Sequence, residues 1–165
     1  MGPGGGKTSD FPDGGAAREA IYKLQPEAVT AGLNAVADYV RGLPAASGKV
    51  AVAGFCWGGA QTFRFATNRA GLAAAFVFYG TGPDNVSGSD APVYGFYGGD
   101  DERVNATLPA TRDRMKQAGK RFADVVYEGA GHGFMRSGED PNGSAPNKSA
   151  REAAWRRWLE LLGSM

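Results

Sequence analysis

The chain has 165 residues, of which 42% are hydrophobic and 21% are charged, and its formal net charge is +1. This length and balance are typical of one globular domain with a sizeable core. A nearly neutral chain gives no electrostatic reason to bind nucleic acid or an anionic membrane, and no apolar run is long enough to cross a membrane.

Cysteine and histidine each occur once in the chain. A single cysteine excludes an intrachain disulfide, and one cysteine with one histidine argues against a structural zinc site. The N-terminus lacks the charged and then apolar pattern of a secretory signal. We therefore expect a cytoplasmic protein that needs neither a metal nor an organic cofactor.

Residues 1–15 are rich in glycine and show no apolar periodicity, so we expect a flexible leader followed by one domain over residues 16–165. Gly2–Thr8 is similar to a phosphate-binding loop. It has three residues between its outer glycines where that loop needs four, and no strand precedes it. We therefore do not expect nucleotide binding.

Beyond the leader, predicted helices and strands alternate along the chain. Apolar spacing and Pro26 predict a helix that ends before Gly42, and Ser149 with Glu152 forms a capping box for a last helix. The other predicted helices cover residues 57–68 and 108–118, and the predicted strands cover residues 50–53, 73–79, 92–97 and 123–127. Residues 50–53 read as a strand that is buried on both faces. This alternation predicts an α/β fold with a mostly parallel sheet between helices.

The pentapeptide Gly54-Phe55-Cys56-Trp57-Gly58 directly follows the first predicted strand. A strand that runs into Gly-x-nucleophile-x-Gly is typical of the nucleophile elbow of α/β-hydrolases. We expect Cys56 to be a nucleophile on a strained backbone, next to a helix N-terminus that stabilises its thiolate. Both flanking glycines are expected to be necessary, because a Cβ there would collide with the neighbouring strand and helix.

A thiolate nucleophile needs a base that takes its proton and a carboxylate that orients the base. His132 lies in a glycine-rich stretch after the last predicted strand, while Asp100 and Asp101 follow the strand that ends at Tyr97. The order nucleophile, acid, histidine is that of α/β-hydrolases, with each group at the carboxyl end of a strand. Either aspartate could orient the histidine, and either could merely cap the following helix.

Each of these residues also has a plainer interpretation. A lone cysteine is usually a small buried hydrophobic residue, a loop histidine often binds only backbone, and the Trp57 ring could pack in the core instead of lining a pocket. The flanking glycines, the preceding strand and the ordered partners favour catalysis.

Three segments resemble the dienelactone hydrolases: Gly-Phe-Cys-Trp-Gly-Gly at 54–59, Gly-Gly-Asp-Asp-Glu-Arg-Val at 98–104 and Gly-Ala-Gly-His-Gly-Phe at 129–134. The resemblance extends from about Arg18 to the C-terminal helix. It implies an α/β-hydrolase-like three-layer sandwich and a Cys-Asp-His triad that hydrolyses lactone or ester bonds. The family's acid stands three residues before a valine, which indicates Asp101 with Val104.

The same resemblance implies a site for an anionic substrate. Family members that act on dienelactone hold its carboxylate with two arginines, which correspond to Arg136 and to Arg18. The latter opens an Arg-Glu-x-x-Tyr-Lys-Leu stretch that includes Tyr22. An arginine fork can bind a carboxylate through two hydrogen bonds, although both residues could equally be solvated surface groups.

One departure from the family concerns the N-terminus. Full-length relatives carry several strands and a helix upstream of the stretch matched by Arg18, so the resemblance implies an N-terminally truncated fold. The upstream part normally supplies a second oxyanion-hole N–H and a glutamate that engages the resting cysteine. The backbone N–H of Trp57 is then the remaining oxyanion donor, and the loss of one such donor typically costs about 2.7–4 kcal/mol of transition-state stabilisation.

The sequence therefore predicts a dienelactone hydrolase-like ester or lactone hydrolase that acts on a small, anionic molecule. One alternative is a general esterase for small neutral esters. Another is a non-catalytic domain that forms a homo-oligomer through the sheet edge that the missing strands leave open.

Overall fold

The structure is a computed structural model in which residues 7–165 are described. The chain divides into two compact units, Met1–Gly48 and Lys49–Met165. The predicted division into a leader over residues 1–15 and a domain over residues 16–165 stays a prediction. Within the described residues, no helix has both the length and the apolar character needed to cross a membrane.

The first unit consists of helices. A short 3₁₀ turn, Thr8–Asp10, precedes α1 (Gly14–Tyr22) and α2 (Pro26–Arg41). The Asp13 side chain caps α1 by accepting a hydrogen bond from the Ala16 N–H at 2.8 Å. Helical structure therefore begins inside the stretch predicted as a flexible leader, of which residues 1–6 lie outside the described residues. The helix predicted from Pro26 is confirmed, with its proline in the first turn.

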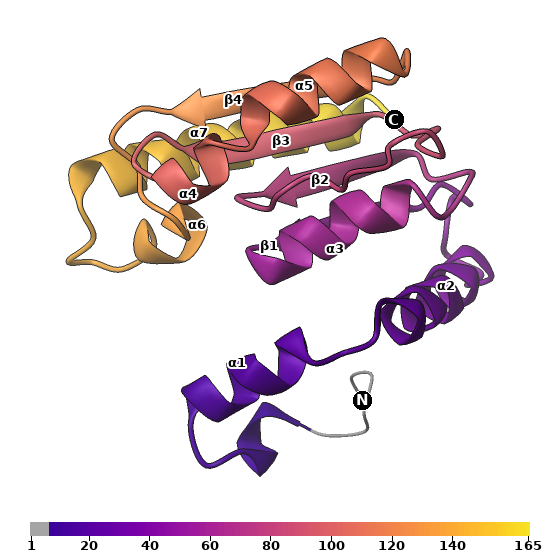
Figure 1. Cartoon of the computed structure of the whole chain (residues 1–165), viewed down its shortest axis with the longest axis horizontal. Coiled ribbons are helices and arrows are strands. Elements are labelled where there is room, and N and C mark those ends of the chain that lie inside the picture. The colour runs from indigo at the N-terminus through magenta and orange to yellow at the C-terminus, as the bar shows by residue number, and fades with distance from the viewer. Residues whose placement is uncertain (1–6) are drawn as a thin grey trace. The chain divides into compact units, whose positions relative to one another are not determined.

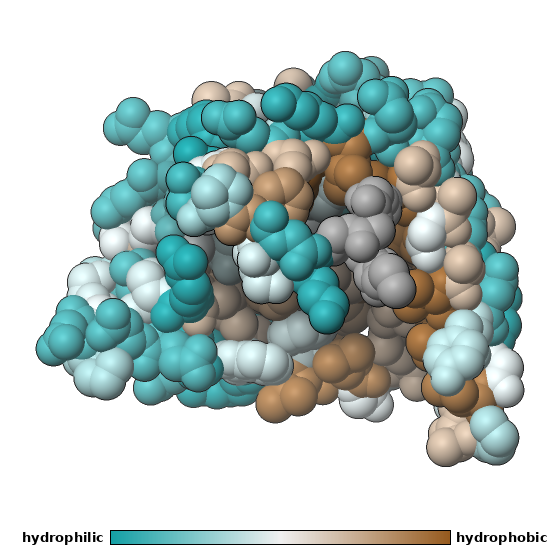
Figure 2. Space-filling model, turned by 90° about the horizontal axis from the view of Figure 1, so that it is seen from below, coloured by the Kyte–Doolittle hydropathy of each residue, from teal (hydrophilic) through white to brown (hydrophobic). Residues whose placement is uncertain are grey.

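Several large apolar side chains of this unit stay exposed, and Figure 2 shows apolar residues uncovered among hydrophilic ones on the face that it draws. Those most open to solvent are Tyr22, Val36 and Tyr39, which are 62%, 60% and 70% exposed. Scattered apolar side chains of this size are common on protein surfaces, so these three do not by themselves indicate a binding surface.

The second unit contains a sheet of four parallel strands in the order β1-β2-β3-β4 (Figure 1). The strands are β1 (Ala51–Phe55), β2 (Ala74–Phe78), β3 (Val93–Gly98) and β4 (Phe122–Tyr127). This confirms the predicted parallel α/β sheet. Because all four strands run the same way, their carboxyl ends meet at one edge, where open α/β sheets place their sites.

Helices cover both faces of the sheet, which gives the predicted three layers (Figure 1). On one face, Phe63 of α3 (Trp57–Ala66) packs against Phe122 of β4, with ring centroids 5.5 Å apart. On the same face, α5 (Leu108–Gln117) contacts β4. On the other face, α7 (Ala145–Gly163) contributes to a core cluster that also includes side chains of β2 and β3.

Aromatic side chains dominate that core cluster. Phe78 of β2 stacks on Phe96 of β3 at 4.4 Å, and both are fully buried. Trp158 of α7 meets Phe78 edge to face at 5.0 Å. Burial of such rings removes a large apolar area from water, so this contact of α7 with the sheet is a main source of stability for the unit.

Two expectations about these elements are wrong. The first strand is not buried on both faces, since Ala53 is exposed and Val52 is only half-buried. The reason is that β1 is an edge strand and pairs only with β2 within the described residues. The last helix does not begin at the Ser149–Glu152 box. It begins at Ala145, because the Ser144 hydroxyl accepts a bond from the Asn147 N–H and caps the helix earlier.

Candidate active site

Cys56 lies between β1 and α3 with φ 54° and ψ −120°, a backbone conformation that residues other than glycine rarely adopt. Such strain typically costs about 1–3 kcal/mol and persists only where the surroundings hold it. Here the Cys56 N–H donates to the Phe78 carbonyl at 3.0 Å, and the Cys56 carbonyl accepts from the Ala60 N–H at 3.2 Å. The thiol is free and exposed, so the backbone presents it to solvent as an elbow requires.

The glycines around Cys56 have unequal roles. A Cβ on Gly54 would lie 2.5 Å from the Gly58 carbonyl carbon, and one on Gly59 would lie 2.6 Å from the Phe78 carbonyl oxygen. A Cβ on Gly58 would meet nothing within 4 Å. The expectation that both Gly54 and Gly58 are sterically necessary is therefore correct for Gly54 and wrong for Gly58. The close approach of α3 to β2 depends instead on Gly59.

Trp57 is the first residue of α3, and its side chain is half-buried. Backbone N–H groups in the first turn of a helix have no partner within the helix. The Trp57 N–H is one of these groups, and its role as an oxyanion donor stays a prediction. The positive end of the α3 dipole lies at the same point and favours negative charge there.

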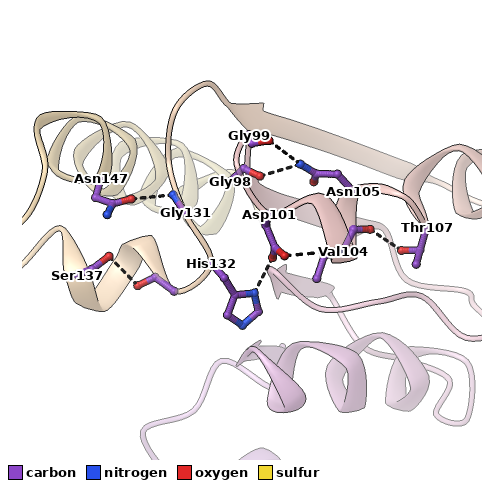
Figure 3. Close-up of polar contacts among 11 residues, drawn as sticks. Gly98, Gly99, Asp101, Val104, Asn105, Thr107, Gly131, His132, Ser137 and Asn147 are labelled. Carbon is purple, nitrogen blue, oxygen red and sulfur yellow. Dashed lines mark hydrogen bonds and ion pairs between the residues drawn. The ribbon is translucent and has the colours of Figure 1, made fainter.

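The Nδ1 atom of His132 lies 2.5 Å from the Oδ2 atom of Asp101 (Figure 3). Asp101 is buried at 6% exposure, whereas the adjacent Asp100 is exposed. The other carboxylate oxygen of Asp101 accepts a bond from the Val104 N–H and caps α4 (Glu102–Asn105). Asp101 thus both caps a helix and holds the histidine, so the two roles that the sequence left open are compatible in one residue.

Further side chains hold the two loops that carry this pair, and sequence reasoning missed them. The Asn105 amide donates to the Gly98 and Gly99 carbonyls at 2.8 and 3.1 Å, and the Asn147 side chain accepts from the Gly131 N–H at 2.9 Å (Figure 3). A Cβ on Gly98 would lie 2.5 Å from the Ala130 carbonyl oxygen. The end of β3 therefore packs directly on the histidine loop, which brings Asp101 and His132 together.

Cys56 and His132 line one cavity of about 480 Å³. Its apolar side is formed by Phe55, Met135 and Trp155. A hollow of this size, mostly apolar with a few polar groups, suits a small organic molecule. A nucleophile and a histidine–carboxylate pair that share such a cavity can carry out acyl transfer.

The charged groups of the cavity are Arg136, Glu139 and Arg151. Arg136 lies on α6 (Phe134–Ser137). The family resemblance predicts that this arginine binds a substrate carboxylate. Arg151 was not predicted. It belongs to α7, and its Nε donates to the Met135 carbonyl at 3.1 Å. The cavity is thus lined by two guanidinium groups and one carboxylate, of which Arg151 and Glu139 form an ion pair at 3.5 Å.

Arg18 and Tyr22 lie on α1, in the first unit, and both are exposed. They are four residues apart, so they share one face of the helix and could contact the same ligand group. Their role in substrate binding stays a prediction.

Tyr79, at the end of β2, is a cavity residue that sequence reasoning also missed. Burial, followed by the neighbouring Cys56, raises the pKa of its phenol to about 12, which Arg136 partly opposes. The phenol is therefore neutral at ordinary pH. Its O–H group can act as a hydrogen-bond donor but does not give up its proton. The sequence signal that could have identified Tyr79 as a site residue is its position directly after a buried strand beside the elbow.

Among residues 7–165, no cluster of three or more histidine, cysteine, aspartate or glutamate side chains could hold a metal ion.

A parallel sheet between two helical layers, with a strained nucleophile position at the end of β1, defines a protein of the α/β-hydrolase fold. The chain belongs to the dienelactone hydrolase family, whose sequence profile matches residues 3–165. A curated relative from Methylorubrum extorquens, named "Putative carboxymethylenebutenolidase", is 33% identical over 133 residues, which are 70% of this chain and 45% of the relative. A relative of the same name from Escherichia coli K12 is 29% identical over 153 residues, 85% of this chain and 55% of its own.

Solved structures show the same fold. The chain is similar to a crystal structure titled "Putative Dienelactone Hydrolase" from Klebsiella pneumoniae, with a TM-score of 0.82 and 24% identity over 97% of this chain and 71% of the other. MGS-M1, an α/β hydrolase from a deep-sea metagenome library, matches with a TM-score of 0.64 and 18% identity, over 84% of this chain and 64% of the other. The chain spans about half the length of the curated relatives that it matches.

The unequal roles of the elbow glycines lead to a prediction. Gly54→Ala should lower the free energy of unfolding by about 2 kcal/mol or more, because its Cβ overlaps backbone that cannot move away. Gly58→Ala, which meets open space at the start of α3, should be neutral or stabilising by up to about 1 kcal/mol. Urea unfolding of both variants measures this difference, and equal destabilisation by the two would contradict the steric argument.

Proposed function

We propose that this protein hydrolyses carboxylic ester or lactone bonds through Cys56, His132 and Asp101, with a thioester intermediate, as a dienelactone hydrolase-like enzyme of the carboxymethylenebutenolidase type. The observation that carries the proposal is the 2.5 Å contact of Asp101 with His132 beside a cavity that Cys56 also lines. Membership of the dienelactone hydrolase family supports the same reaction class.

In the first half of the reaction, the Cys56 sulfur attacks the carbonyl carbon while His132 takes the thiol proton. Asp101 binds Nδ1 of His132, so the other ring nitrogen is the one left to move protons. The negative charge that develops on the carbonyl oxygen is stabilised by the Trp57 N–H. The tetrahedral intermediate then collapses, and His132 protonates the leaving alkoxide, which gives an alcohol and a thioester.

In the second half, His132 takes a proton from water, and the resulting hydroxide attacks the thioester carbonyl. Collapse of this intermediate returns the proton from His132 to the Cys56 sulfur and releases a carboxylic acid. In a lactone the alcohol and the acid belong to one product molecule. The single free thiol suits the reducing cytoplasm, where we expect the protein to work.

The cavity supports a small substrate with a negative charge. Arg136 lies at the cavity and is the proposed ligand of a substrate carboxylate. From the family resemblance, Arg18 and Tyr22 of α1 are also proposed as substrate-binding residues. The competing function is a general esterase for neutral esters, in which these arginines are surface groups.

Substitution of the nucleophile tests the reaction. Cys56→Ala should lower kcat/KM for an activated ester, such as p-nitrophenyl acetate, by roughly a thousandfold or more, because no other group can form the acyl intermediate. The thiol is exposed, so the melting temperature should stay close to that of the unchanged protein. Full turnover by a folded Cys56→Ala variant would exclude the proposed mechanism.

Charge variants test the substrate class. Arg136→Gln should lower kcat/KM about 10- to 100-fold for an ester that carries a carboxylate and leave a matched neutral ester within about twofold, because one charge-assisted contact is lost. Arg18→Gln tests the proposed role of Arg18 in the same assay, and Arg156→Gln, at an exposed position on α7, is the control. Unchanged selectivity in both test variants would favour the general esterase.

Self-association is a second candidate property. Strand β1 pairs with a neighbour on one side only within the described residues, and large apolar side chains remain exposed beside it or on α7, among them Phe55, Trp155 and Leu159. Open sheet edges and apolar patches favour pairing with another chain. A second copy of this chain is the proposed occupant.

Sedimentation velocity over a range of concentrations tests this association. We expect a dimer or larger species that Ala53→Lys weakens, because Ala53 is exposed on β1 and a lysine on an edge strand opposes pairing. Lys120→Ala is the control variant, because it changes a charge on the loop before β4, away from the β1 edge. A monomer at all concentrations would rule the association out.

A further inference from the structure

Tyr79 occupies a backbone conformation that needs an explanation. Its φ is +42°, and Cys56 is the other non-glycine residue with a positive φ in the described part of the chain. The two strained residues are neighbours in space, because the Cys56 N–H donates to the carbonyl of Phe78, the residue before Tyr79. Strain of this kind tends to collect at functional sites, and the observed outlier is a reason to look for a role.

The surroundings hold this strained backbone in place. The Tyr79 N–H donates to the Phe96 carbonyl at 2.8 Å. The following residue, Gly80, packs so tightly on α3 that a Cβ there would lie 2.8 Å from the Gly59 α-carbon. The chain therefore turns sharply after β2 and directs the tyrosine ring into the cavity that contains Cys56 and His132.

The ring of Tyr79 is in direct contact with the catalytic histidine. The two rings meet edge to face, with centroids 5.0 Å apart and an angle of 61°. Phe134, two residues after His132, packs on another part of the same tyrosine at 5.4 Å. Tyr79 is 4% exposed, so its ring is fixed in this position.

The His132 ring is held at one atom by a hydrogen bond. Its side chain is 34% exposed, and the Asp101 carboxylate binds its Nδ1 atom. With Nδ1 held by this bond, the ring can still tilt through coupled changes of its two side-chain torsion angles. A second contact from the side determines the plane of the imidazole and hence where its other nitrogen points.

We propose that Tyr79 is a positioning residue, whose ring holds the His132 imidazole in the orientation that directs its free nitrogen toward Cys56. This inference rests on the proposed function of Cys56 and His132. The strained backbone after β2 is explained by the same role, because it is what places the ring against the histidine. The phenol has a raised pKa of about 12, so it stays neutral and adds no charge to the pair.

Variants that keep or remove the ring test the proposal. Tyr79→Phe keeps it, whereas Tyr79→Leu and Tyr79→Met remove it. With p-nitrophenyl acetate, we expect kcat of Tyr79→Phe to stay within about twofold and kcat of the ringless variants to fall roughly tenfold or more, with KM changed less than about threefold. Tyr94→Leu is the matched control, because this half-buried ring stacks on Phe76 and does not contact His132.

Two further measurements do not depend on turnover, because the chain has one cysteine and one histidine. Alkylation by iodoacetamide reports only on Cys56, and its rate should fall in the ringless variants, since a displaced imidazole no longer assists removal of the thiol proton. The downfield NMR signal of an Nδ1 proton can come only from His132. It should persist in Tyr79→Phe and broaden through exchange with water in Tyr79→Leu and Tyr79→Met.

Several outcomes would overturn the proposal. They are an unchanged alkylation rate and Nδ1 signal without the ring, a loss of kcat in Tyr79→Phe as large as in Tyr79→Leu, or an equal loss of kcat in Tyr94→Leu. If the unchanged protein hydrolyses no ester, the proposed function fails, and the alkylation and NMR measurements still decide whether Tyr79 positions His132.

Discussion

The close packing of α3 against β1 and β2 is the constraint on which the site depends. Backbone approaches backbone at Gly54, Gly59 and Gly80, where a Cβ would lie within 2.9 Å of a neighbouring backbone atom. This packing forces the sharp turn at Cys56 and leaves its thiol exposed at the start of a helix. The backbone strain is thus sustained by the contacts of α3 with the sheet, which themselves bury large side chains such as Phe63.

A second close contact assembles the remainder of the site. The end of β3 packs on the histidine loop at Gly98, and side-chain amides of Asn105 and Asn147 bind the backbone of the two loops. Asp101 and His132 are 31 residues apart in the chain, yet they meet at 2.5 Å. The same parallel order of strands places Cys56 on the cavity that His132 lines, so one topological feature brings three distant residues to one edge.

Much of this arrangement could be predicted, and the errors have local causes. Continuous apolar runs located the four strands, and apolar spacing located the helix from Pro26. No helix was predicted at α1, α4 or α6, and the last two have four residues each, too few to show a period. The capping box predicted the start of the last helix at Ser149, but two serines offer caps and the earlier one, Ser144, is used.

The sequence by itself determined the parallel α/β sheet, the candidate nucleophile Cys56, the candidate base His132 and the two candidate acids Asp100 and Asp101, because these follow from residue type, spacing and order along the chain. Only the tertiary structure decided between Asp100 and Asp101, and between Gly58 and Gly59 as the glycine that allows close packing. It alone placed Tyr79 and Arg151 at the cavity. These features are distances between segments far apart in sequence, and no local pattern encodes such a distance.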